Sequence, residues 1–252
     1  MRPPRDALKM TLEPVINIPE HTVDVYLFNI ARLNYDAAAC FAVLEPQEQQ
    51  QAEKFYRPAL RQAYIHMHAL MRQILAAYIP GESAADLRFT KGEYGKPYLE
   101  AAPALRFNLS HSGDWGLLAV GHDIEVGVDI ETIKPRAGLA GLVAKCFSAA
   151  EQQYWQQLPP QQQVEVFFEI WTRKEALVKA VGRGIALGLE FCELQPPDLN
   201  QFSSLPAVCG PSAQWQILPL NVETCARAAI VVQANDYRIR MQSLSQVIAS
   251  PQ

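Results

Sequence analysis

The sequence predicts an α+β fold built from two similar halves. Short runs rich in β-branched and aromatic residues, which indicate strands, alternate with longer polar and apolar mixtures, which indicate helices. A short pattern also occurs twice, because Leu44–Glu48 (LEPQE) and Phe147–Glu151 (FSAAE) each precede a pair of predicted helices. This repeat predicts a pseudo-dimer of two α+β subdomains, residues 1–123 and 124–252, with a cleft where they meet.

Composition limits the classes of protein that this chain can be. Its 252 residues, 49% of them hydrophobic, are enough to form a core without disulfide bonds or structural metals. The formal charge of −4 has the wrong sign for a nucleic-acid-binding face, and the five cysteines include no CxxC pair. No run of 18 apolar residues indicates a membrane span, and the N-terminus lacks the apolar core of a signal peptide. We therefore expect a cytoplasmic protein that binds neither membranes nor nucleic acid.

The first half is predicted to contain a strand followed by two helices. Val23–Ile30 is rich in β-branched and aromatic residues, which is typical of a strand. The ranges 46–56 and 61–78 contain mixed polar and apolar residues and indicate helices, with Pro58 between them and Pro80-Gly81 ending the second.

The second half is predicted to begin with a hairpin. Residues 116–120 and 124–131 have the composition of strands, and they flank a turn at 121–123. Ser148 and Glu151 have the spacing of a capping box, in which each side chain binds a backbone N–H of the other residue. The remaining predictions are helices at 138–146, 148–157 and 161–181 and strands at 187–193, 215–219 and 227–233.

Two carboxylates share one face of the strand at 124–131. Successive side chains of a strand point to opposite faces, so Asp129 and Glu131 lie on the same face as Gly127. Their Cβ atoms are roughly 7 Å apart, which lets both carboxylates reach one hard cation, and Gly127 is expected to leave room beside them. Taken alone, the pattern is more typical of a solvated strand face.

The helix at 161–181 places charged residues within its apolar arc. Lys174 and Glu175 lie on the same side as Phe168 and Trp171, and an unpaired charge there costs several kcal/mol. Lys179 follows Glu175 by one turn. The alternative is a surface ion pair between Glu175 and Lys179, but the neighbouring aromatic residues favour a functional cleft.

Two further motifs suggest anion binding. Residues 108–112 (NLSHS) lack the GxSxG elbow of a serine hydrolase, so we expect an anion-binding turn there. Residues 92–97 (GEYGKP) do not have the glycine spacing of a Walker A loop, and Pro97 stands where a magnesium-binding hydroxyl would be. Lys96 in this glycine-rich turn can still hold a phosphate.

These motifs together resemble the Sfp-type 4′-phosphopantetheinyl transferases. Gly95–Pro97, Phe107–Ser112, Gly127–Glu131 and Trp171–Lys179 occur in the order and spacing of that family. The resemblance extends to the two repeated patterns and covers roughly residues 20–235. It implies a pseudo-dimer of two similar α+β halves with the active site in the cleft between them.

The resemblance implies transfer of the phosphopantetheine arm of coenzyme A to a serine of an apo carrier protein, with release of 3′,5′-ADP. Asp129, Glu131 and Glu175 would then ligate Mg²⁺, which suits ligands that are all oxygens. Asp129, Glu175 and Lys179 would be the catalytic residues. Lys179 would contact the phosphates, and Glu175 would accept the serine proton directly or through water. Which group acts as the base stays open.

The resemblance also implies contacts to the phosphates of coenzyme A. Lys96, Ser110 and His111 match family positions that bind them. The family's two lysines in the first helix are replaced here by Glu48 and Gln51.

Other basic residues could supply the charge of those missing lysines. Arg61 is the predicted substitute for coenzyme A binding, with Lys54 and Arg57 as alternatives, and Arg72 matches a family arginine.

Two alternative functions stay open at this point. The paired carboxylates with a nearby lysine would also suit a metal-dependent phosphohydrolase, and the phosphate-binding residues alone would suit a noncatalytic module that binds coenzyme A or a carrier protein. Acyl and peptidyl carrier domains of fatty acid, polyketide and nonribosomal peptide biosynthesis are all possible acceptors. Because a two-halved chain builds the whole site, we expect a monomer.

Overall fold

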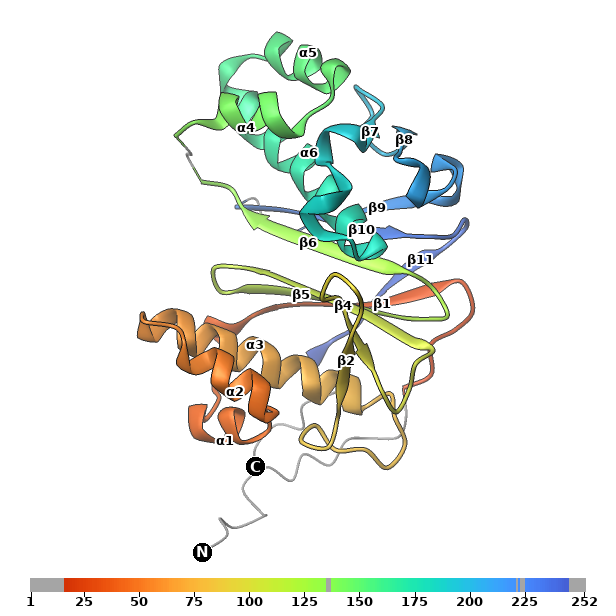
Figure 1. Cartoon of the computed structure of the whole chain (residues 1–252). Helices are drawn as coiled ribbons and strands as arrows, with labels where there is room; N and C mark the ends of the chain where they lie inside the picture. Colours follow the sequence, from red (N-terminus) through yellow and green to blue (C-terminus); the bar gives the residue numbers. More distant parts are fainter. Residues whose placement is uncertain (1–15, 135–136, 221, 223–224, 245–252) are drawn as a thin grey trace, which may run out of the picture.

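The chain folds into stacked layers of helices and sheets. The computed structural model describes residues 16–134, 137–220, 222 and 225–244. In Figure 1, helix α3 (Pro58–Ala76) lies below two adjacent sheets and helix α6 (Pro160–Val181) lies above them. This arrangement has the α+β class that the sequence predicts.

Two sheets form the centre of the molecule. The first has the order β11-β1-β5-β4 and the second has the order β6-β10-β9. The strands of the first are β1 (Thr22–Asn29), β4 (Leu105–Ser112), β5 (Trp115–His122) and β11 (Arg238–Met241). Those of the second are β6 (Val126–Thr132), β9 (Gln216–Leu220) and β10 (Ala226–Val232). Two small hairpins pair β2 (Phe89–Lys91) with β3 (Pro97–Leu99) and β7 (Glu193–Leu194) with β8 (Phe202–Ser204).

The helices begin at the signals that the sequence carries. Pro46 and Pro58 occupy the first turns of α2 and α3, where the missing N–H of proline costs nothing. Ser148 and Glu151 form the predicted capping box of α5. Gly182, with φ of +74°, ends α6. The other helices are α1 (Ala37–Ala42), α2 (Pro46–Glu53), α4 (Leu139–Cys146) and α5 (Ala149–Gln157).

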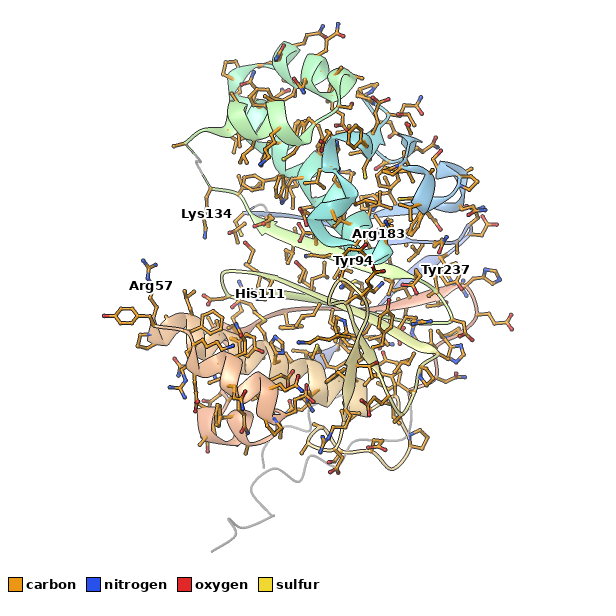
Figure 2. All side chains as sticks on the ribbon, viewed as in Figure 1. Arg57, Tyr94, His111, Lys134, Arg183 and Tyr237 are labelled. Atoms are coloured by element: carbon orange, nitrogen blue, oxygen red, sulfur yellow. The ribbon has the colours of Figure 1, made fainter. Side chains whose placement is uncertain are left out.

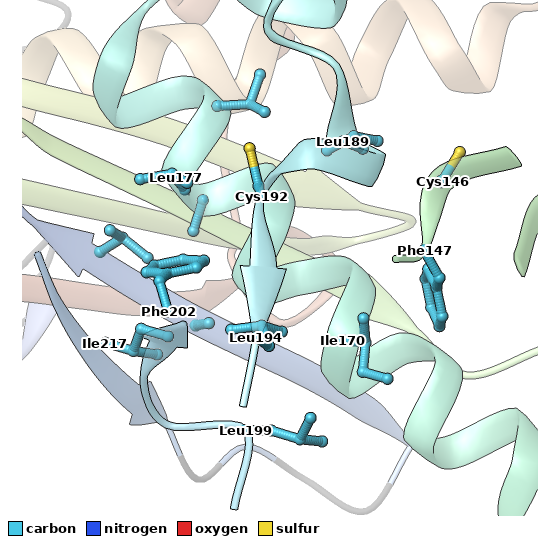
Figure 3. Packing of buried hydrophobic residues seen from close by; sticks show 14 of the residues in the cluster. Cys146, Phe147, Ile170, Leu177, Leu189, Cys192, Leu194, Leu199, Phe202 and Ile217 are labelled. Atoms are coloured by element: carbon cyan, nitrogen blue, oxygen red, sulfur yellow. The ribbon is translucent and has the colours of Figure 1, made fainter. Parts of the chain in front are cut away.

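Separate apolar clusters hold the layers together. Met67 and Ile74 of α3 pack against Phe107 of the first sheet, and Val128 and Ile130 of β6 belong to a cluster between the two sheets. A third cluster joins α6 to the β7–β8 segment and β9. Figure 3 shows part of this third cluster, including Ile170, Leu177, Leu194, Phe202 and Ile217. Each fully buried aliphatic side chain contributes about 1.5–3 kcal/mol by leaving water.

The predicted hairpin between 116–120 and 124–131 is wrong. Both edges of β5 are occupied by neighbours in its own sheet, since β5 pairs with β1 on one side and β4 on the other. No edge of β5 is therefore left for β6, which pairs with β10 in the second sheet. The residues at 121–123, including Asp123 with φ of +50°, instead carry the chain from one sheet to the other.

The strand predicted at 187–193 is also largely wrong. Residues Gly184–Leu187 and Leu189–Phe191 form 3-10 turns, and only Glu193 and Leu194 form a strand. Gly188 has φ of +74°, a conformation that interrupts a strand and that glycine adopts without strain. Further 3-10 turns occur at Ile30–Arg32, Ala207–Cys209 and Ser212–Gln214.

The C-terminal strand returns to the first sheet. β11 pairs in parallel with β1, so a segment from the predicted second half, 124–252, completes the sheet of the first half. Arg240 of β11 donates to both carboxylate oxygens of Asp24 at 2.5 and 2.6 Å, and Tyr78 of the first half donates to the same carboxylate at 2.7 Å. Asp24 is fully buried, so Arg240 supplies the counter-charge that this carboxylate needs.

The two halves share a buried ion-pair arrangement. Glu48 of α2 binds Arg72 of α3 at 2.6 Å, and Glu151 of α5 binds Lys174 of α6. Each glutamate also completes a capping box at the start of its own helix. Each cation donates to backbone carbonyls beyond its long helix, Arg72 to Leu87 and Lys174 to Leu189. The same kind of buried ion pair therefore joins α2 to α3 and α5 to α6.

Removing one partner of the Glu151–Lys174 pair should be strongly destabilising. Both side chains are at most 1% exposed, so Lys174→Met leaves the Glu151 carboxylate without its counter-charge. We expect a loss of roughly 3–5 kcal/mol in the free energy of unfolding, measured by urea titration. Glu165→Gln, which removes an exposed partner of Arg227, is the matched control and should cost roughly 1 kcal/mol or less. A loss of that same small size for Lys174→Met would contradict the assigned role.

Candidate active site

Helix α6 lies directly against strand β6 at Gly127. A Cβ atom on Gly127 would lie 2.0 Å from the carbonyl oxygen of Ala176 and 2.3 Å from the nitrogen of Ala180. Backbone therefore contacts backbone, and only glycine fits between them. The sequence-based expectation that Gly127 leaves room for a cation is wrong, because the helix fills that space.

This crossing brings the predicted site residues together. Asp129 lies two residues beyond Gly127 on β6, and its Oδ1 accepts from Nζ of Lys179 on α6 at 2.6 Å. Asp129 is only 4% exposed, whereas Lys179 and Glu175 are partly exposed. Val126, Val128 and Ile130 point into the core between the sheets, so the predicted alternation of the strand is confirmed.

Ser110 of β4 joins the same polar cluster from the first sheet. Its hydroxyl donates to Asp129 Oδ1 at 2.9 Å and accepts from Nζ of Lys179 at 2.8 Å. The side chain is 5% exposed. Three elements from different parts of the chain, β4, β6 and α6, thus meet at one carboxylate oxygen.

Side chains of β4 bind the free edge of β6. Residues 108–112, predicted to form an anion-binding turn, are instead part of strand β4, and its alternate side chains face β6. The hydrogen bonds run from Val128 N to Asn108 Oδ1 at 2.8 Å, from Ile130 N to Ser110 Oγ at 3.4 Å and from Thr132 N to Ser112 Oγ at 3.1 Å. These side chains satisfy backbone donors that β10 does not reach, and they fix β6 relative to the first sheet.

Burial and like charge make the carboxylates harder to ionise. Burial raises the pKa of Asp129, and this rise is partly offset by the ammonium of Lys179. Burial also raises the pKa of Glu175, and the negative charges of Asp129 and Glu131 raise it further. The Glu131 carboxylate accepts from Ser112 at 2.9 Å. Acidic groups that repel one another in this way favour a bound cation.

The donor set suits a hard divalent cation. Asp129, Glu131 and Glu175 offer only carboxylate oxygens, and Oδ2 of Asp129 is buried with no hydrogen-bond partner among the described residues. In the part of the chain that the structure describes, no three His, Cys, Asp or Glu side chains converge closely enough to enclose an ion. Lys179 instead supplies the positive charge beside Asp129.

Lys96 is held by three acceptors of the second half. Its ammonium donates to Glu125 Oε2 at 2.7 Å, to the Ala180 carbonyl at 2.7 Å and to the Val126 carbonyl at 3.3 Å. An ammonium has three hydrogens, and these acceptors take all of them. The arrangement therefore gives this side chain a structural role, and its contact with coenzyme A stays a prediction.

The other predicted phosphate contacts differ in exposure. His111 is exposed on β4, and partial desolvation together with the charges of His68 and Lys179 lowers its pKa. Figure 2 shows His111 between the two halves, on the same side of the molecule as Arg57 and Lys134. Arg61 instead lies over the ring of Phe41, 5.8 Å from its centre.

The acidic substitution at Glu48 has a structural reason. Its carboxylate binds Arg72 at 2.6 Å and His68 at 2.9 Å, and it is 8% exposed. Those contacts lower the pKa of Glu48 against the effect of burial, which alone would raise it. Glu48 and Arg72 therefore hold α2 against α3. Arg72 is fully buried and is not a phosphate ligand in this arrangement.

Comparison with known proteins assigns the family. Residues 120–239 match the model of the 4′-phosphopantetheinyl transferase superfamily, and residues 33–122 match that of the 4′-phosphopantetheinyl transferase N-terminal region. The chain belongs to this superfamily.

Several relatives of this transferase carry the same name. The 4′-phosphopantetheinyl transferase HetI of Nostoc sp. is 32% identical over 194 residues, covering 76% of this chain and 79% of that protein. A 4′-phosphopantetheinyl transferase of Bacillus subtilis is 34% identical over 149 residues, covering 59% and 65%. AcpT of Escherichia coli K12 is 38% identical over 137 residues, covering 49% and 70%. The chain is thus a 4′-phosphopantetheinyl transferase.

Sequence reasoning missed several residues that build the site of this transferase. Asn108 and Ser112 were not singled out, although the alternation of polar residues at 108, 110 and 112 is a strand signal. Glu125 was not identified as the partner of Lys96, which lies far from it in the sequence.

None of the described helices is long and apolar enough to cross a membrane.

Gly127→Ala should separate α6 from β6. The added methyl group would overlap the backbone of α6, which cannot move aside as a flexible side chain could. We expect a loss of about 3 kcal/mol or more, at or above the upper end for overpacked cores, in urea unfolding. Gly141→Ala in α4 is the matched control, since nothing lies within 4 Å of its added Cβ, and it should be neutral or stabilising. Equal effects of the two substitutions would contradict the backbone contact.

Glu175→Gln should stabilise the protein at neutral pH. The raised pKa of Glu175 means that the folded state binds this proton more tightly than the unfolded chain does. The stabilising contribution of the protonated form is complete below the unfolded pKa, roughly 4.3, and is lost as pH rises through the folded value. The melting temperature of Glu175→Gln should therefore exceed that of the wild type at pH 7, by a margin that shrinks toward pH 4. Exposed Glu53→Gln is the control, and a lower melting temperature for Glu175→Gln at pH 7 would refute this assignment.

Proposed function

We propose that the protein transfers the phosphopantetheine arm of coenzyme A to a serine hydroxyl of an apo carrier protein and releases 3′,5′-ADP. The observation that carries this proposal is the cluster of Asp129, Ser110 and Lys179, with Glu175 electrostatically coupled to it. Such a cluster combines carboxylates for a divalent cation with a lysine for phosphate oxygens. The family membership supports the same reaction.

Asp129, Glu131 and Glu175 would hold Mg²⁺. When bound, the ion would neutralise charge on the pyrophosphate of coenzyme A and on the departing nucleotide. The unpartnered buried oxygen of Asp129 and the mutual repulsion of the carboxylates support this assignment.

Glu175 and Lys179 are the proposed proton acceptor and phosphate ligand. Glu175 is partly exposed beside Lys179 and Asp129, so its carboxylate can accept the serine proton directly or through water. Lys179 is partly exposed, so its ammonium can turn from Asp129 toward phosphate oxygens. Asp129 would then orient Ser110 through the hydrogen bond already formed.

His111 and Ser110 are the proposed contacts to coenzyme A phosphates within the cleft between the two halves. His111 is exposed, and its lowered pKa leaves a neutral imidazole whose N–H can donate at pH 7. Arg61 and Arg57 lie exposed on the first half and can add charge for the nucleotide.

The proposed acceptors are acyl or peptidyl carrier domains of fatty acid, polyketide or nonribosomal peptide pathways. The structure holds site residues from both halves in one chain, which supports action as a monomer. The relatives found in the comparisons are named 4′-phosphopantetheinyl transferases, which supports transfer of the same group.

Intact-protein mass spectrometry of an apo carrier protein tests the reaction. Incubation with the enzyme, coenzyme A and Mg²⁺ should add the mass of one phosphopantetheine arm, and a chelator or a carrier without its serine should prevent the gain. Asp129→Ala and Glu175→Gln should remain folded, as judged by circular dichroism, and should reduce transfer by roughly 10²-fold or more. Coenzyme A binding without transfer on several carriers would favour a noncatalytic binding module, and phosphodiester hydrolysis without a carrier would favour a phosphohydrolase.

A further inference from the structure

The side chain of Lys96 crosses from one half of the protein to the other. Lys96 lies in the turn of the β2–β3 hairpin, where Gly92 N donates to the Lys96 carbonyl at 2.9 Å. Its ammonium reaches the start of β6 and the last turn of α6. The side chain is 5% exposed, so its contacts are shielded from water.

Its two carbonyl acceptors flank the contact of α6 with β6. Val126 precedes Gly127, and Ala180 is the residue whose nitrogen lies 2.3 Å from the position of a Cβ on Gly127. Ala180 also follows Lys179 directly. One ammonium therefore binds both partners of the contact at the point where the helix and the strand meet.

The surrounding residues fix the path of the Lys96 side chain. Gly182 ends α6 with φ of +74°, and a Cβ at that position would lie 3.1 Å from Cδ of Lys96. Glu125 balances the charge of the ammonium at 2.7 Å. Beside this contact, the guanidinium of Arg183 lies over the ring of Tyr94, 5.5 Å from its centre, and Figure 2 shows these two residues together.

We propose that Lys96 is a positioning residue, which ties the first half to the junction of α6 and β6 and so holds Lys179 and Glu175 in register with Asp129. This inference rests on the proposed transferase function of the same site. It replaces direct phosphate binding as the role of Lys96. A displacement of roughly 1 Å at reacting groups can cost about 10²-fold in rate. The contacts of Lys96 with the end of α6 can therefore affect the chemical step although Lys96 does not touch the substrate.

Lys96→Met tests the proposal because methionine keeps the apolar stem and removes all three donors. We expect kcat for carrier modification to fall roughly tenfold or more, while KM and the dissociation constant for coenzyme A change by less than about twofold. Exposed Lys91→Met, in the same hairpin, is the matched control and should change neither quantity. A tenfold weaker affinity for coenzyme A with unchanged kcat would overturn the proposal and restore a phosphate-binding role.

Hydrogen exchange at the end of α6 gives a readout that is independent of activity. The amide of Gly182 donates to Val178 at 2.9 Å, and Lys96→Met should accelerate exchange of peptides covering 176–184 relative to the start of α6. Should that variant fail to fold, Glu125→Gln removes the counter-charge and leaves both carbonyl contacts, so a smaller change in the same direction is expected. Unchanged exchange in the folded variant would contradict the proposal that Lys96 holds the end of α6. A wild-type enzyme without transfer activity would contradict the proposed function instead.

Discussion

The contact between α6 and β6 at Gly127 is the constraint on which the rest of the structure depends. With no side chain between the two backbones, the helix has one depth and one position on the strand. That position brings Lys179 to Asp129, which sequence alone places far apart. The apolar clusters on the two faces of the second sheet keep β6 and α6 in contact. Burial of their apolar side chains stabilises this contact, and the glycine determines how closely the helix approaches the strand.

The polar groups around this contact serve both stability and chemistry. On one side, Asn108, Ser110 and Ser112 bind the free edge of β6 in the way that a neighbouring strand would, and they accept from the backbone N–H groups of residues 128, 130 and 132. On the other side, burial raises the pKa values of Asp129 and Glu175, and the negative charges of Asp129 and Glu131 raise that of Glu175 further. The carboxylates that are proposed to hold a cation therefore destabilise the fold while no cation is bound, as is common at functional sites of enzymes.

Local sequence patterns predicted much of the fold but little of the sheet topology. The alternation of β6, the start of α2 at Pro46 and the Ser148–Glu151 capping box depend on neighbouring residues, and all are confirmed. Pro58 was predicted to separate two helices and instead begins α3. The predicted hairpin of β5 with β6 failed because pairing depends on β1 and β4, which compete for the edges of β5.

As with the fold, only part of the candidate site was predicted from the sequence. Asp129, Ser110 and Lys179 were identified from motifs and do meet. The contacts of Lys96 could not be predicted, since its acceptors at Val126 and Ala180 are backbone groups without a sequence signature. A crystal structure with coenzyme A and Mn²⁺, whose anomalous signal locates the metal, tests the central claim most directly. The account predicts an ion bound by Asp129, Glu131 and Glu175, with Lys179 on phosphate and Gly127 still against α6. An ion and pyrophosphate bound away from these carboxylates, with Lys179 still on Asp129, would contradict it.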